Sequence, residues 1–98
     1  MIIAETIMQQ IQAGHVPNCK NGLHAMMCWA ARDFMNLGNG VSFKVTGRKL
    51  KGTVKVVYQE GADWYDIHFL NLRGREISKL DGIYCDQLAE LIDGVIEQ

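Results

Sequence analysis

The hydrophobic pattern of the chain changes its period at Gly38-Asn39-Gly40. Before these residues, apolar side chains recur at the three- and four-residue spacing of helices; after them, they alternate with polar side chains as in half-buried strands. The segments VSFKV, LKGTVKVVY and WYDIHFL alternate in this way and are joined by the short turns TGRK and QEGAD. The pattern therefore predicts an antiparallel meander over residues 41–80, with a short fourth strand after the turn at residues 73–75.

Helical spacing predicts helices over residues 1–14, 22–38 and 84–97, with a loop over residues 15–22 that contains Pro17. The predicted apolar face of the second helix consists of Leu23, Met26, Met27, Ala30, Phe34 and Leu37. That of the last helix consists of Tyr84, Leu88, Leu91, Ile92 and Val95, with acidic residues opposite. This order predicts one two-layer α+β domain over residues 1–98, in which helices pack on one face of a three- or four-stranded antiparallel meander.

Lysines decide which face of the predicted sheet meets solvent, because a buried row of lysines costs too much free energy. The predicted solvent face therefore carries Ser42, Lys44, Lys51, Thr53 and Lys55, together with Trp64, Asp66 and His68. The opposite face, predicted to be buried, carries Phe43, Val45, Val54, Val56, Tyr65, Ile67 and Phe69. A register error of one residue would exchange the two faces.

Composition limits the class of protein. A chain of 98 residues with 48% hydrophobic and 21% charged residues is typical of a single globular domain. Its uncharged stretches are too short to span a bilayer, which predicts no membrane partner. The first residues lack the pattern of a signal peptide, and three cysteines, an odd number, favour reduced thiols over a disulfide framework. We therefore expect a cytoplasmic protein.

Charge is unevenly distributed along the chain. Residues 41–58 contain five basic residues and no acid, and residues 83–98 contain acids and no base. Such polarity can steer an anionic partner to one side of a domain. Alternatively, the two regions neutralise each other across the fold, and the pattern leaves both interpretations open.

Four segments resemble a family of small proteins encoded by phages, prophages and other mobile elements: WAARDF (29–34), VSFKVTGRKLKGTVKV (41–56), DWYDIHFLNLRG (63–74) and GIYCDQL (82–88). The residues that carry the resemblance include Phe34, Asp63, Tyr65, Asp66, Phe69, Tyr84, Asp86, Gln87 and Leu88. The resemblance implies a phage-type accessory origin, and no activity, substrate or catalytic residue comes with it. The segment HVPNCKNGLHAMMCW departs from the family pattern, so a site in it would be peculiar to this chain.

That segment contains four residues of the types that bind zinc: His15, Cys19, His24 and Cys28. His24 and Cys28 are four residues apart on a predicted helix and can point together. However, the segment has no Cys-x2-Cys pair, and a single helical cysteine is usually a small buried apolar residue. The sequence therefore favours no metal ion and no cofactor.

Catalysis has little support in the sequence. Cys85 begins the last predicted helix, where the helix dipole lowers a thiol pKa, and His68 or His24 is a conceivable partner. The acidic neighbour Asp86 opposes a thiolate, and no phosphate-binding loop, Ser-His-Asp order or HExxH motif occurs. We therefore expect no enzyme.

Simpler structural roles account for the polar residues near these positions. Asp86 and Gln87 are expected to cap the last helix, and Tyr84 to pack on the sheet. Asp63 is expected in the turn before the third strand, and Asp66 is expected to pair with Lys55 across neighbouring strands.

Two functional hypotheses remain. The first is a non-catalytic module that binds a host or phage protein through the open sheet face or the acidic last helix. The second is a nucleic-acid-binding domain, because helix–three strands–helix is the element order of double-stranded RNA-binding domains and the basic strands over residues 44–55 can contact phosphates. The isoelectric point near 6.3 argues against the second hypothesis. The predicted binding residues are Trp64, Asp66, His68, Lys44, Lys51, Lys55, Arg48 and Arg73, and a homodimer paired through a free strand edge is a further expectation.

Overall fold

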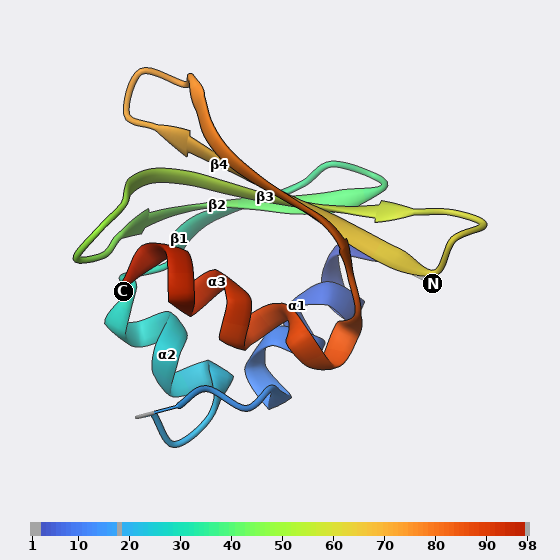
Figure 1. Ribbon diagram of the computed structural model, residues 1–98, viewed down its shortest axis with the longest axis horizontal. Coiled ribbons are helices and arrows are strands. Elements are labelled where there is room, and N and C mark those ends of the chain that lie inside the picture. Colours follow the sequence, from blue (N-terminus) through green and yellow to red (C-terminus); the bar gives the residue numbers. More distant parts are fainter. Residues whose placement is uncertain (1–2, 18, 98) are drawn as a thin grey trace.

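In the described part of the chain, residues 3–17 and 19–97, five antiparallel strands form one sheet, and three α-helices cover one of its faces (Figure 1). The elements of this computed structural model are α1 (Ile3–Ala13), α2 (Gly22–Cys28), β1 (Arg32–Asn36), β2 (Gly40–Thr46), β3 (Lys51–Gln59), β4 (Trp64–Asn71), β5 (Glu76–Ile83), the 3₁₀ turn η1 (Cys85–Gln87) and α3 (Leu88–Ile96). The strands lie in chain order from β1 to β5. The prediction of a two-layer α+β meander is therefore confirmed, with a fifth strand.

The predicted faces of the sheet are also confirmed. Phe43 of β2, Val54 of β3 and Phe69 of β4 are register partners in one row, and all three are fully buried beneath the helices. The neighbouring row contains Lys55 paired with His68 on the opposite face. The free-energy cost of burying lysines thus identified the solvent face of the sheet correctly. Among the residues predicted to face solvent, Ser42 is buried, because it lies in register between Met35 and Lys55.

The prediction of one helix over residues 22–38 was wrong. The helix ends at Cys28, Ala30 adopts a left-handed backbone conformation (φ 52°), and residues 32–36 form β1 along the edge of β2. Trp29 explains the difference. In a continued helix it would point roughly a third of a turn away from the predicted apolar face, whereas here it is fully buried and its carbonyl oxygen accepts a hydrogen bond from the Thr46 N–H at 2.7 Å.

The last helix agrees with the prediction on its apolar side and differs elsewhere. Leu88 and Ile92 are fully buried, and the Gln87 side chain caps the 3₁₀ turn η1, directly before α3, by accepting a hydrogen bond from the Tyr84 N–H at 3.2 Å. Tyr84, however, is exposed and does not pack on the sheet as predicted. Asp93, predicted on the acidic outer side, is only 5% exposed. Its carboxylate accepts a hydrogen bond from the Trp29 indole at 2.8 Å.

The remaining predictions concern the N-terminal segments. The predicted helix over 1–14 corresponds to α1, and residues 1–2 of that prediction lie outside the described residues, as does residue 18 in the predicted loop. Ile7 and Ile11 of α1 are fully buried against the sheet.

No helix in the described part of the chain is long and apolar enough to cross a membrane.

Candidate functional site: an apolar groove and a thiol–imidazole cluster

The structure spreads the predicted binding residues along the open face of the sheet. Trp64 and Asp66 line one hollow, whereas Lys55 and His68 are register partners in the middle of β3 and β4. Trp64 lies at the start of β4, beside the β3–β4 turn, and is 37% exposed. Arg48 lies in the β2–β3 turn and Arg73 lies in the β4–β5 turn. Both turns are at the opposite end of the sheet, on the left in Figure 1. Lys51 is exposed at that same end. The predicted set therefore does not form one site.

Several polar residues on the open face have polar partners there. Asp66 accepts hydrogen bonds from the Gln59 amide at 2.8 Å and from the Gly82 N–H at 3.3 Å, so the predicted Asp66–Lys55 pair is wrong. The reason is register, because Lys55 stands opposite His68. Ion pairs on the strands and their ends are Lys79–Asp81 and Lys44–Asp33, and the His68 imidazole contacts the Glu76 carboxylate. Exposed pairs of this kind contribute little stability, yet they leave the face polar.

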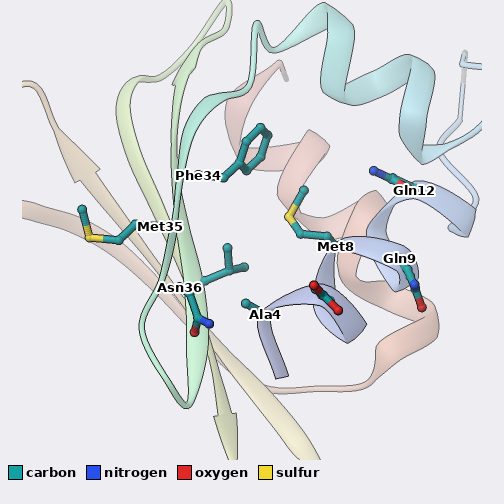
Figure 2. Close-up of a pocket in the computed structure, with 9 residues that line it drawn as sticks. Ala4, Met8, Gln9, Gln12, Phe34, Met35 and Asn36 are labelled. Carbon is teal, nitrogen blue, oxygen red and sulfur yellow. The ribbon is translucent and has the colours of Figure 1, made fainter. Parts of the chain in front are cut away.

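A second surface, which the sequence did not indicate, is an apolar groove between α1, α2 and β1. Two hollows of about 440 and 470 Å³ adjoin there and share Met8, Gln12 and Phe34. The remaining residues of the first hollow are Ala4, Glu5, Gln9, Met35, Asn36 and Val41, and those of the second are Leu23, Met26, Met27, Ala30 and Ala31. In Figure 2, Phe34 and Met8 point into the space between β1 and α1, while Met35 lies on the other side of the strand.

The groove exists because β1 is irregular. The register between β1 and β2 shifts between Arg32 and Met35, and Asp33 in this bulge is left-handed (φ 56°). The bulge lets the Phe34 ring lean on Phe43, at a centroid distance of 5.6 Å, and leaves Phe34 49% exposed. Met27 of α2 is 73% exposed on the opposite side of the second hollow. Sequence reasoning missed this surface because it placed Phe34 and Met27 on one face of a single helix.

Three of the four predicted zinc-type residues lie together. Cys19, His24 and Cys28 each offer a ligand atom, and these atoms all lie within 4.8 Å of one another. Asn21 caps α2 by accepting a hydrogen bond from the His24 N–H at 2.9 Å, which places His24 and Cys28 on successive turns of the helix. His15 is exposed and does not belong to the cluster.

The three cysteines are expected to differ in reactivity. Burial, followed by the negative charge of Asp93, raises the pKa of the Cys19 thiol above its ordinary value, while Cys28 and Cys85 are exposed. A raised pKa lowers the thiolate fraction at neutral pH, and the thiolate is the form that reacts. We therefore predict that iodoacetamide modifies Cys28 and Cys85 before Cys19, as measured by peptide mass spectrometry of the reduced, chelator-treated chain at pH 7.5. Modification of Cys19 at the same rate would contradict this prediction.

Cys85 lines a separate hollow of about 280 Å³ with Tyr58, Asp63, Tyr65 and Tyr84. The hydroxyl of Tyr58 donates to Asp63, and that of Tyr65 donates to Gln10, each at 2.7 Å. Neither His24 nor His68 is among the lining residues, so the Cys–His pair considered for Cys85 is not formed at this hollow.

The chain was also compared with known proteins. No protein family, no curated protein and no solved structure matches it. Functional inference therefore rests on the surfaces described above, among which the apolar groove and the Cys19–His24–Cys28 cluster lie on different sides of the same short helix, α2.

Proposed function

We propose that the chain is a non-catalytic protein-interaction module that binds an amphipathic helix of a partner protein in the groove between α1, α2 and β1. The observation that carries this proposal is the continuity of the two hollows through Met8, Gln12 and Phe34. Single exposed apolar residues are common on protein surfaces, whereas a contiguous apolar depression marks an interaction site.

A helix fits this groove better than an added strand. Strand addition needs a regular edge with a row of unpaired backbone groups, and β1 is five residues long and interrupted at Asp33. A helix satisfies its own backbone hydrogen bonds and contributes only side chains to a groove. Methionine is also suited to this role, because its flexible thioether side chain adapts to different apolar shapes. Met8 and Met27 lie on the two helical walls.

The open sheet face and the basic turns have less support as docking surfaces. The open face presents charged and polar pairs, and Trp64 stands apart from the basic residues of the opposite end. The sheet has five strands rather than three, so the element order gives less support to a nucleic-acid-binding domain of the α-β-β-β-α type. A phage-type accessory role in the cytoplasm, acting on a host or phage protein, belongs to this proposal and rests on the motif resemblance and the unpaired cysteines.

A library of displayed helical peptides, selected for binding to the full chain, tests whether the groove binds an amphipathic helix. We predict enrichment of peptides with apolar residues at positions i, i+3 or i+4 and i+7. Binding of a selected peptide should shift the methyl NMR signals of Met8 and Met27. Phe34→Asp and Met27→Asp should each weaken its binding at least 10-fold, since removing a central contact typically costs about 2 kcal/mol or more.

Ile77→Asp is the matched control, because Ile77 is a similarly exposed apolar residue (54%) on β5 and lines neither hollow. Its peptide affinity should equal that of the unchanged chain. The selected peptide should also displace any partner captured from host lysate. Selected peptides without apolar periodicity, or equal binding by Ile77→Asp and Met27→Asp, would rule out the groove as a helix-binding site.

A further inference from the structure

The Cys19–His24–Cys28 cluster has the composition and the arrangement of a metal site. Two sulfur atoms and an imidazole nitrogen within 4.8 Å of one another are close to the separations in a tetrahedral zinc site. There, Zn–S bonds of about 2.3 Å and Zn–N bonds of about 2.0–2.1 Å place ligand atoms roughly 3.5–3.8 Å apart. The ligand atoms are therefore at most about 1.3 Å farther apart than in a formed zinc site.

The backbone around the cluster is held at both ends. Val16, three residues before Cys19, is fully buried, and its carbonyl oxygen accepts a hydrogen bond from the Cys19 N–H at 3.1 Å. Trp29, directly after Cys28, is fully buried as well. Between these anchors, the Asn21 cap fixes the start of α2. The three donors are thus carried by a framework that the core positions, as a preorganised site requires.

Two side chains of the cluster, those of His24 and Cys28, have little other use, whereas Cys19 also packs partly against the core. Cys28 and His24 are exposed, so neither contributes to the core. The Lys20 N–H lies 3.5 Å from Nδ1 of His24, which is the upper limit for a hydrogen bond. The imidazole therefore gives up little when it turns toward a metal ion.

From this geometry we infer that Cys19, His24 and Cys28 bind one zinc ion per chain, with the fourth coordination position open to water. Two thiolates and a neutral imidazole are donors that suit zinc and leave the site formally neutral. Three protein ligands with an open position distinguish this site from a closed structural site. The inference is independent of the groove, because Cys19, His24 and Cys28 line neither of its hollows.

Cobalt binding to the reduced full chain, freed of metal by chelation, tests this inference, because Co²⁺ adopts zinc geometry and absorbs visible light. We expect one equivalent of Co²⁺ to produce a thiolate-to-cobalt charge-transfer band and the intense visible absorption of tetrahedral cobalt, and zinc to remove both. Cys28→Ser should lower zinc affinity at least about 10-fold, since even outer-shell changes cost about 10–100-fold. Bound zinc should also slow alkylation of Cys28 and leave that of Cys85 unchanged.

Cys85→Ser and His15→Ala are the matched controls, because both remove a residue of the same type outside the cluster. Each should bind zinc as the unchanged chain does, and circular dichroism should show that all variants are folded. Absence of the charge-transfer band, or an equal loss of affinity in Cys85→Ser, would overturn the site. Loss of affinity in His15→Ala would overturn the open fourth position.

Discussion

Replacement of Trp29 by alanine is expected to lower the free energy of unfolding by about 3–5 kcal/mol, the range for removing a large buried aromatic side chain. Trp29 is among the largest fully buried side chains of the described chain, at the junction between α2 and the sheet. A domain of this size has a total stability of about 5–15 kcal/mol. The variant should therefore be partly unfolded under mild conditions, which urea titration followed by circular dichroism measures.

A smaller change separates packing from hydrogen bonding at the same position. Trp29→Phe keeps much of the ring and removes the indole N–H that donates to Asp93 at 2.8 Å. The buried carboxylate then loses its donor, and hydrogen bonds to charged groups contribute about 1.5–3 kcal/mol. Trp64→Phe is the control, because Trp64 is partly exposed and should change stability by less than about 0.5 kcal/mol. Equal stability of the two phenylalanine variants would show that the Trp29–Asp93 bond contributes nothing.

Gly22→Ala is expected to be at least as damaging as the phenylalanine variant. A β-carbon at Gly22 would lie 1.5 Å from the carbonyl oxygen of Ile11, which belongs to the backbone of α1 and has no side-chain freedom to move away. The Gly22 N–H also donates to the Gly14 carbonyl at 2.9 Å, so the two helices meet backbone to backbone. Separation of α1 and α2 would open the core, and we expect a loss of more than about 3 kcal/mol.

Gly94→Ala is the control, and its expected change in the free energy of unfolding has the opposite sign. Gly94 lies within α3, and a β-carbon there would have no neighbour within 4 Å apart from the adjoining residues and the backbone of its own helix. Alanine is favoured over glycine in a helix by about 0.5–1 kcal/mol, so this variant should be more stable than the unchanged chain. Thermal unfolding of both variants measures the difference. A stable Gly22→Ala protein would mean that α1 and α2 do not approach so closely.

If both proposed sites exist, α2 connects them. Leu23 and Met27 line the groove, and each directly precedes a residue of the cluster, His24 or Cys28. Zinc binding would hold α2 to the preceding loop through Cys19 and thereby stiffen one wall of the groove. Peptide affinity and zinc affinity would then depend on each other by the same factor, because linkage is reciprocal.

The sequence alone determined the parts of the structure that depend on near neighbours and on solvent. Alternation of Phe43, Lys44 and Val45 identified a strand and its buried side, because the cost of burying lysine acts on each residue wherever it lies. Helical spacing of Ile7, Ile11, Leu88 and Ile92 likewise identified the core faces of α1 and α3.

Tertiary structure alone decided the end of α2, the fifth strand, the groove and which of the four zinc-type residues lie together. The helix ends where Trp29 is buried and donates a hydrogen bond to Asp93. Asp93 lies 64 residues away and was itself predicted to face solvent. The turn after α2, at Trp29 and Ala30, allows residues 32–36 to pair with β2 and Phe34 to line the groove. It also leaves Cys28 beside Cys19. The physical reason is that a buried polar pair and a sheet edge are satisfied by partners distant in sequence, which no local periodicity encodes.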